Sequence, residues 1–354
     1  MVTNPWVIRG REVGVSLMDL VTGGAGFVGK RLVSTLAEYG RPVRVLDTVS
    51  CQTAYEKGAS PTEYIAGSIT NKTDAELACE RVETVFHLAG IADLWRPNPA
   101  DFDHVNHHGT CTMLKAAKTA GVTTFVHCSS ATTFIGTKTP IGPSIVDETS
   151  AIPVEQGLGA YPKSKILAER AAIEASTAYR KSSDMRVVIV NPTEPLGPGD
   201  ESLTPPTKMI LDFVNQKTPA SLDCMLNFVS LHDLAEGFIA AAERGGNGER
   251  YLLAGDNTSM ADLLSLTARL SNVSMPKAKV PYLLALLIGV IDTKLIAPLT
   301  RRPPTAPLTG VRLAGRRVSF DASKAAQELA WKAAPIEPAL VEMLDWARSK
   351  QLIA

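Results

Sequence analysis

The stretch that decides the fold is Thr22-Gly23-Gly24-Ala25-Gly26-Phe27-Val28-Gly29, which follows the apolar run 17–21 and opens a helical pattern. Gly23 permits a tight turn, Gly26 lets the backbone approach an anion at the helix start, and Gly29 permits close packing of helix on strand. This strand–turn–helix context predicts the first unit of a parallel α/β sheet.

Apolar runs continue to alternate with helical patterns as far as residue 191. Continuous apolar strands separated by helices indicate a parallel sheet that is covered on both faces. We therefore predict an α/β fold, a Rossmann doubly wound parallel sheet with a smaller C-terminal substrate-binding region. The expected strands are 17–21, 43–46, 62–66, 84–88, 124–128, 186–190 and 227–230.

The alternation of strand and helix patterns stops at residue 191, where a Pro- and Gly-rich segment begins. This segment predicts a loop that leaves the sheet. We expect residues 16–191 and 226–250 to form the Rossmann domain. Residues 192–225 and 251–354 are then expected to form the smaller region, where a substrate would bind beyond the carboxyl ends of the strands.

The composition excludes several classes of protein. Lys+Arg and Asp+Glu both total 36, so the basic excess typical of a nucleic-acid binder is missing and we expect no nucleic-acid partner. Five scattered cysteines without CxxC spacing argue against a disulfide framework or a zinc site and favour a reducing, cytoplasmic location. Residues 1–15 have no apolar core of a signal peptide and are predicted to be an N-terminal extension.

The second predicted strand ends at Asp47, 18 positions after Gly29. A carboxylate at this place accepts hydrogen bonds from the adenosine ribose 2′-hydroxyl of a dinucleotide and repels a 2′-phosphate. The position therefore predicts NAD as the cofactor in preference to NADP, with an ordinary acid at a strand end as the alternative interpretation.

Tyr161 and Lys165 stand four residues apart in a helical pattern and therefore share one helix face. A nearby ammonium stabilises a phenolate and lowers its pKa, so Tyr161 is expected to exchange a proton with an alcohol or ketone while hydride moves. The strand 124–128 ends in Ser129-Ser130, and one hydroxyl is expected to hold the substrate oxygen. We favour Ser130, with Ser129 as the alternative.

Together these motifs resemble the extended short-chain dehydrogenase/reductase family. The resemblance covers roughly residues 16–350, and its nearest branches are the 3β-hydroxysteroid dehydrogenase and dihydroflavonol-reductase group and the hopanoid-associated sugar-epimerase-like proteins. The matching motifs are Thr22–Gly29, Asp47, His87–Gly90, Val105–Thr110, Ser129-Ser130, Tyr161–Lys165, Asn191–Asp200 and Arg316–Ala325.

The resemblance implies a role for each matched residue. Ser130, Tyr161 and Lys165 would be catalytic, with Asn106 as a structural or proton-relay group beside them. Ser68 departs from the family, which usually carries Asp at this position for the adenine amino group. The implied cofactor-binding residues are Gly23, Gly26, Phe27, Val28, Gly29, Asp47, Ser68, Ile69, Leu88, Ala89, Gly90, Lys165 and Pro192; no metal is implied, and His104, His107 and His108 are expected to be a solvated helix start.

The choice of substrate depends on the C-terminal region. A nucleotide-sugar enzyme needs Arg and Lys for a diphosphate, but the segment 221–229 offers no arginine and one acid. We therefore predict an oxidoreductase that interconverts a secondary alcohol and a ketone on a hydrophobic small-molecule substrate, steroid-, terpenoid- or flavonoid-like. The alternatives are a nucleotide-sugar epimerase or dehydratase with tightly bound NAD, supported by Arg301, Arg302, Arg316 and Arg317, and a non-catalytic NAD-binding or scaffold protein.

The most apolar run, Val280–Ile291, is too short to span a bilayer. We favour a buried or pocket-lining helix, and the alternatives are an apolar substrate entrance or a peripheral membrane contact. The helices expected near 106–120 and 161–178 resemble those through which relatives pair, which implies a homodimer.

Overall fold

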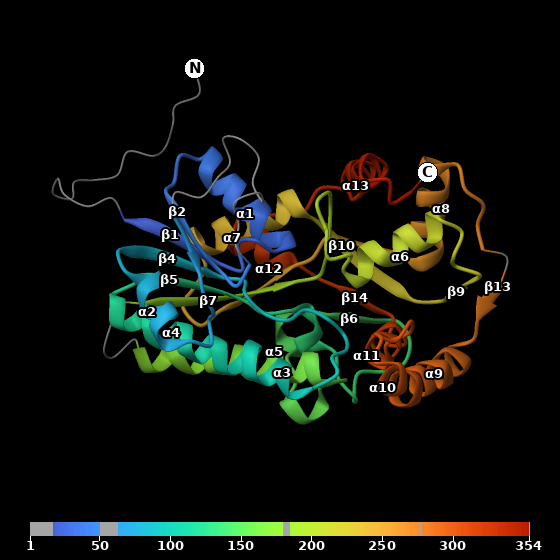
Figure 1. Ribbon diagram of the computed structural model, residues 1–354, viewed down its shortest axis with the longest axis horizontal. Helices are drawn as coiled ribbons and strands as arrows, with labels where there is room; N and C mark the ends of the chain where they lie inside the picture. The colour runs from blue at the N-terminus through green and yellow to red at the C-terminus, as the bar shows by residue number, and fades with distance from the viewer. Residues whose placement is uncertain (1–16, 50–62, 180–184, 277, 354) are drawn as a thin grey trace, which may run out of the picture.

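The protein is described here by a computed structural model that covers residues 17–49, 63–179, 185–276 and 278–353. Its centre is a seven-stranded sheet with the order β11-β7-β5-β4-β1-β2-β3, and every neighbouring pair runs parallel (Figure 1). The Rossmann fold class expected from the sequence is thereby confirmed. The strands are β1 (Met18–Thr22), β2 (Val43–Asp47), β3 (Glu63–Ala66), β4 (Val82–His87), β5 (Thr124–Cys128), β7 (Arg186–Pro192) and β11 (Arg250–Leu253).

Helices cover both faces of this sheet, as its continuous apolar strands require. On one face, α1 (Phe27–Glu38), α7 (Leu231–Arg244) and α12 (Ser323–Glu328) enclose one core cluster. On the other face, α2 (Lys72–Cys79), α4 (Gly109–Ala120) and α5 (Ala160–Tyr179) enclose a second cluster. The two layers lie above and below the sheet in Figure 1.

The order of the strands reverses between β1 and β4, which are neighbours in the sheet although β2 and β3 lie between them in the chain. The connections from these two strands therefore leave toward opposite sides and open a crevice at the carboxyl edge. The glycine turn after β1 and the segment after β4 both lie at this crevice, which places the candidate site there.

A smaller region follows β7. Strands β8 (Glu194–Leu196), β10 (Met225–Ser230) and β12 (Asp256–Ser259) form a three-stranded sheet, and its core cluster includes residues of α6 (Pro205–Val214), α8 (Met260–Ser271) and α13 (Glu337–Ser349). Two short parallel pairs complete it, β6 (Ser144–Val146) with β14 (Val318–Phe320) and β9 (Ala220–Leu222) with β13 (Ala278–Val280).

The expected division of the chain needs two corrections. The strand at 225–230 pairs with β8 and β12 and not with the Rossmann sheet, whereas 250–253 forms the edge strand β11 of that sheet. The cause is the loop after Asn191, which carries the chain out of the main sheet so that the next strand pairs locally. The predicted N-terminal extension, 1–15, lies outside the described residues.

The apolar run also differs from the favoured expectation of a buried helix. Residues 282–300 form one continuous helix, made of α9 (Tyr282–Ile291), the π-helical turn η5 (Asp292–Ile296) and α10 (Ala297–Thr300). The helix therefore extends well beyond the apolar run 280–291, whose own length excludes a membrane span. Most of its large apolar side chains are exposed to solvent. The helix packs beside α11 (Leu308–Ala314) at one end of the molecule, where Figure 1 shows α9, α10 and α11 together.

Candidate active site

The glycine turn has the shape that a dinucleotide pyrophosphate requires. Gly23 has a φ of +72°, and a Cβ there would lie 2.8 Å from the Ala89 backbone of the neighbouring segment. A Cβ on Gly29 would clash with the Gly23 carbonyl oxygen. Helix α1 begins after Gly26 without a side-chain cap, so the first-turn N–H groups, including those of Phe27 and Val28, are available for an anion. These residues fit NAD.

Asp47 ends β2 beside this turn. One carboxylate oxygen accepts a hydrogen bond from the Ala25 main-chain nitrogen at 3.0 Å, and the other accepts from Val49 at 3.2 Å. The glycine turn therefore holds the acid beside the crevice, in the place where an adenosine ribose would reach it.

The remaining predicted cofactor residues surround the same crevice. The main-chain nitrogen of Ser68 donates to Asp74 at 2.8 Å, and its hydroxyl bonds Thr70, so this side chain is already engaged within its own loop. Ile69 is buried and packs where a Cβ on Gly109 would lie. Leu88, Ala89 and Gly90 follow β4, and Pro192 is the last residue of β7.

Tyr161 and Ser130 meet at the carboxyl edge of the sheet. Tyr161 lies in the first turn of α5, and its hydroxyl is hydrogen bonded to the Ser130 side chain. The Ser130 hydroxyl also accepts from the Thr132 main chain at 3.2 Å, which caps the 3-10 turn η2 (Ala131–Phe134). Ser129 instead donates to Glu169, so Ser130 is the hydroxyl that faces Tyr161.

Lys165 lies one turn further along α5. Its ammonium donates to the Cys128 carbonyl at 2.9 Å, and it lies 3.6 Å from where a Cβ on Gly90 would be. The ammonium is thus fixed between the ends of β5 and β4, next to the predicted path of a nicotinamide ribose. Burial lowers the pKa of Lys165.

The expected lowering of the Tyr161 pKa needs correction. Burial raises the pKa of Tyr161 to about 12, and the hydrogen bond from Ser130 opposes this shift only in part. The desolvation of a phenolate outweighs its stabilisation because the ring is enclosed, with Phe102 at a centroid distance of 6.1 Å. The protein by itself therefore holds Tyr161 as a proton donor.

Asn106 fastens the segment after β4 to the catalytic helix. Its carboxamide accepts from the Ile91 nitrogen at 2.7 Å and donates to the Ile91 oxygen at 3.0 Å. It also donates to Ser164 at 2.9 Å, and Ser164 donates to the Tyr161 carbonyl. The residue lies in a π-helical turn, η1 (Asp103–His108), between α3 (Ala100–Phe102) and α4, so the helix begins earlier than the sequence pattern predicts. These contacts give Asn106 a positioning role.

A buried carboxylate behind the site was missed by the sequence analysis. Glu169 accepts hydrogen bonds from Ser129 at 2.5 Å, Asn191 at 2.7 Å and Arg250 at 2.5 Å. Because Ser129 directly follows β5 and Asn191 is the next-to-last residue of β7, this acid ties together the ends of two neighbouring strands beside the proton-transfer residues. Its signal in the sequence is weak, since one Glu on a long helix has no distinctive spacing.

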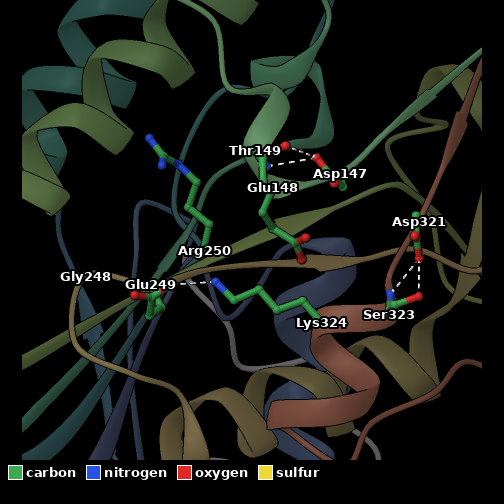
Figure 2. A pocket seen from close by; sticks show the side chains of 9 residues that line it. All are labelled: Asp147, Glu148, Thr149, Gly248, Glu249, Arg250, Asp321, Ser323 and Lys324. Carbon is green, nitrogen blue, oxygen red and sulfur yellow. Dashed lines mark hydrogen bonds and ion pairs between the residues drawn. The ribbon is translucent and has the colours of Figure 1, made fainter.

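Arg250 also lines a polar hollow of about 440 Å³ at the outer edge of the sheet. Figure 2 shows Arg250, Glu148 and the Lys324–Glu249 ion pair around it, all close to β11 and the start of α12. The β11 edge is the edge opposite β3, so this hollow is separate from the crevice at β1 and β4.

Glu194 is the second residue that the sequence analysis missed. It lies on β8, two residues beyond the end of β7, and one carboxylate oxygen is buried without a hydrogen-bond partner. Burial raises its pKa from 4.5 to about 7. A signal was available, because Glu194 is the only charged residue in the stretch 187–199.

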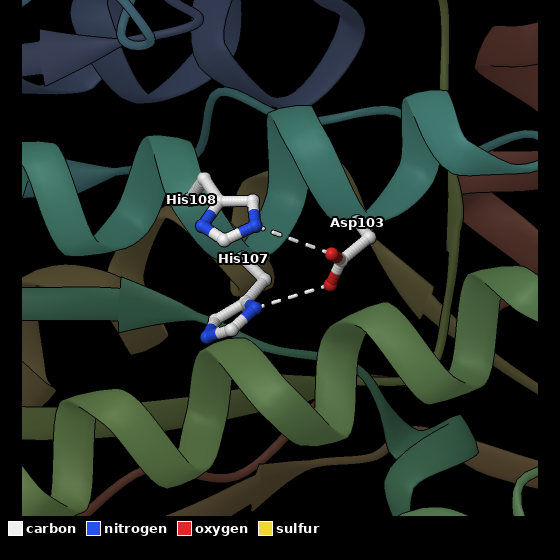
Figure 3. Close-up of side chains that lie close together, drawn as sticks. All are labelled: Asp103, His107 and His108. Atoms are coloured by element: carbon white, nitrogen blue, oxygen red, sulfur yellow. Dashed lines mark hydrogen bonds and ion pairs between the residues drawn. The ribbon is translucent and has the colours of Figure 1, made fainter.

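The histidines at the start of the helix before α4 form a small cluster with one acid. Asp103 bonds His107 at 3.1 Å and His108 at 3.3 Å, one imidazole to each carboxylate oxygen (Figure 3). The three side chains lie close enough to hold a metal ion. His104 is outside this group, and the mutual hydrogen bonds account for the arrangement at a half-exposed helix surface.

This arrangement can carry out coupled proton and hydride transfer. Bound NAD would accept hydride from a carbinol carbon or return it to a ketone. Tyr161 would pass a proton to or from the substrate oxygen, and Ser130 would donate a hydrogen bond to that oxygen. The ammonium of Lys165 would place a positive charge beside them, at the end of β5. Gly23, Gly26, Gly29, Asp47 and Lys165 would hold the cofactor.

A Rossmann sheet of this order, with a tyrosine, lysine and serine at its carboxyl edge, defines an NAD-dependent enzyme of the extended short-chain dehydrogenase/reductase type. Residues 20–254 match the NAD dependent epimerase/dehydratase family, and the chain belongs to this family. The cofactor is accordingly NAD.

Two relatives and one solved structure show what the chain is similar to. A Synechocystis sp. protein named "Putative dihydroflavonol 4-reductase" is 34% identical over 92% of this chain and 93% of its own length. Sterol demethylase protein B of Methylococcus capsulatus is 27% identical over 95% of this chain and 100% of its own. The dTDP-glucose 4,6-dehydratase DesIV of Streptomyces venezuelae, solved with NAD and TYD bound, shares the fold with a TM-score of 0.75, at 21% identity over 95% of this chain and 98% of its own.

Proposed function

We propose that the protein interconverts a secondary alcohol and a ketone on an apolar, fused-ring substrate of the steroid, terpenoid or flavonoid type, with Tyr161 as the acid/base. The observation that carries this proposal is the carboxyl group of Glu194, one oxygen of which is buried without a hydrogen-bond partner just beyond the carboxyl end of β7. An acid in this place can hydrogen bond a substrate hydroxyl, and it offers no positive charge to a diphosphate.

The arginines of the C-terminal region support the same choice. Arg317 forms an ion pair with Asp223 at 3.2 Å, and Arg316 donates to the Thr137 carbonyl at 3.3 Å. Arg301 and Arg302 are exposed next to α10. Arg316 and Arg317 thus have different protein partners and Arg301 and Arg302 are exposed, whereas a nucleotide diphosphate needs several converging donors. Two relatives, named a putative dihydroflavonol 4-reductase and a sterol demethylase protein, agree with an apolar substrate.

The test is a substrate panel with the purified protein. We expect NADH to form from NAD with a 3β-hydroxysteroid or a polycyclic terpenoid alcohol, and NADH to be consumed with the corresponding ketone. Glu194→Gln should raise KM for such an alcohol more than it changes kcat, because it weakens ground-state binding of a hydroxyl. Glu76→Gln, an exposed acid on α2, is the matched control.

The same panel includes UDP-glucose and dTDP-glucose. Conversion of a nucleotide sugar without net formation of NADH, together with no turnover of any apolar alcohol, would overturn the proposal and favour a nucleotide-sugar epimerase or dehydratase. Binding of NAD with no reaction on any member of the panel would favour a binding role.

A further inference from the structure

The continuous helix 282–300 carries an unusual concentration of exposed apolar side chains. Among the described residues, it is the one helix that is long and apolar enough to cross a membrane. It holds eight of the sixteen large apolar side chains that are exposed in the described part of the chain, among them Leu283 at 77% and Leu299 at 84%. Soluble proteins rarely leave such a patch uncovered, so it marks an interaction surface.

The exposed side chains form a continuous ridge. Leu283, Leu287, Ile291, Leu295 and Leu299 follow one another at intervals of four residues and are all exposed. Residues four apart lie above one another on a helix surface, so the ridge runs along the whole length of the helix. A surface of this shape can be covered along its length by one flat apolar layer.

The opposite face of the helix is fixed to the protein. Asp292 accepts a hydrogen bond from the Ala306 nitrogen at 2.9 Å, and Thr293 accepts from the Leu308 nitrogen at 2.9 Å. Gly289 lies against the same 306–311 segment. A helix bound to the body along its side cannot cross a bilayer without breaking these contacts, so its geometry suits a position parallel to a surface.

The exposed charges around the ridge are all positive. Asp292 is the only acid between residues 278 and 302, and it is buried against the protein. Lys279, Lys294, Arg301 and Arg302 are exposed, and none of them forms an ion pair with a described residue. An apolar ridge with a basic border complements anionic lipid headgroups above an acyl layer. A second copy related by a two-fold axis would bring the same cations together.

We propose that the helix 282–300 docks the enzyme on the surface of an anionic lipid bilayer, with the ridge 283–299 in the headgroup–acyl boundary and the four basic residues on the headgroups. The helix packs on α11, and α11 in turn lies against Leu94 and Gly159, close to the start of the catalytic helix α5. The bilayer would therefore lie beside the C-terminal region of the enzyme. The proposal rests on the helix surface and not on the substrate class.

The test is cosedimentation of the full-length protein with vesicles, in the absence of any substrate. We expect binding to vesicles of equimolar phosphatidylcholine and phosphatidylglycerol, and weaker binding to phosphatidylcholine alone. Leu287→Asp and Leu299→Asp should each weaken binding about tenfold or more. Each of Arg301→Gln and Arg302→Gln should weaken it about fivefold on the anionic vesicles only.

Leu77→Asp is the matched control, since Leu77 is also exposed, at 49%, on α2 at the opposite end of the molecule (Figure 1). It should bind vesicles as the parent protein does. Equal thermal unfolding of all variants would show that the fold is intact, because every substituted side chain is exposed.

Three results would overturn the proposal. The first is no binding to anionic vesicles, or binding that Leu287→Asp and Leu299→Asp leave unchanged. The second is retention of the protein on vesicles after an alkaline wash, which would indicate a spanning helix. The third is a dimer, seen by analytical ultracentrifugation without lipid, that Leu287→Asp dissociates, which would show that a second copy covers the ridge.

Discussion

Lys165 donates a hydrogen bond to the main-chain oxygen of Cys128, 2.9 Å away, two residues before Ser130. Ser130 in turn is bonded to the hydroxyl of Tyr161. The end of β5 therefore fixes both the ammonium and the hydroxyl, while α5 supplies the tyrosine. The three proton-transfer groups owe their relative positions to one strand and one helix, which are rigid elements of the core.

Replacement of Tyr161 by Phe should abolish most turnover. The ring and its contact with Phe102 would remain, but the acid/base hydroxyl would be lost, so we expect kcat to fall about 10²–10⁴-fold. NAD binding, followed by fluorescence of NADH, should stay within a small factor of the parent protein. Tyr39→Phe, which removes a surface hydroxyl bonded to Glu236, is the matched control. Full activity of Tyr161→Phe would refute the assignment.

The direction of the Tyr161 pKa shift predicts different pH profiles for the two directions of the reaction. With a pKa of about 12, the phenol is protonated at neutral pH. Reduction of a ketone uses this protonated form and should change little between about pH 6 and 9. Oxidation of the alcohol uses the phenolate, so kcat/KM should rise about tenfold per pH unit over the same range. A plateau of the oxidation rate near neutral pH would contradict this prediction.

Asp47→Ala should relax the choice between NAD and NADP. The substitution removes both the acceptor for the ribose hydroxyl and the charge that repels a 2′-phosphate, so the ratio of the two Kd values should shift about tenfold or more toward NADP. Titration with NADH and NADPH measures the ratio. Asp345→Ala, at an exposed acid on α13, should leave it unchanged. Tighter binding of NADPH by the parent protein would show that Asp47 does not face the ribose.

Glu194 should make the stability of the protein depend on pH. The pKa of Glu194 is raised from 4.5 to about 7 in the fold, so the fold favours the protonated carboxyl. Through Glu194 alone, the free energy of unfolding keeps its full value below about pH 4.5 and falls as the pH rises to about 7, by roughly 3 kcal/mol in total.

Glu194→Gln carries no charge and should escape this loss. Its free energy of unfolding should exceed that of the parent protein by about 2–3 kcal/mol at about pH 8 and by little at about pH 4. Urea unfolding at the two pH values measures the difference. Parallel behaviour of the two proteins at both values would show that Glu194 is not desolvated.

The sequence determined the main sheet well because its strands are apolar along their whole length and each is bounded by a turn. Six of its seven strands fall within two residues of the expected ranges. The edge strand β11 was missed because its four residues follow a polar turn and resemble a short connection. The strand β10 was assigned to the wrong sheet, since an apolar pattern gives the strand but not its pairing partner.

The site was predicted unevenly for a similar reason. Motifs of fixed spacing identified Tyr161, Lys165 and the glycine turn, whereas Glu169 and Glu194 act through burial, which a single sequence does not show. The helix 282–300 was expected to be buried because its composition is that of a core helix. Composition gives the preference for an apolar environment, and only the fold shows whether the protein itself supplies that environment.

The carboxamide of Asn106 bonds both the N–H and the C=O of Ile91. A single side chain thereby makes the pair of main-chain hydrogen bonds that a neighbouring β-strand would make with the segment after β4. This imitation has a polarity, because one end must donate and the other accept. An aspartate at position 106 would still accept the hydrogen bond from the Ile91 N–H, but its second oxygen would repel the Ile91 C=O. Exchanging one amide nitrogen for an oxygen would thus remove one of the two hydrogen bonds while leaving the shape of the side chain the same.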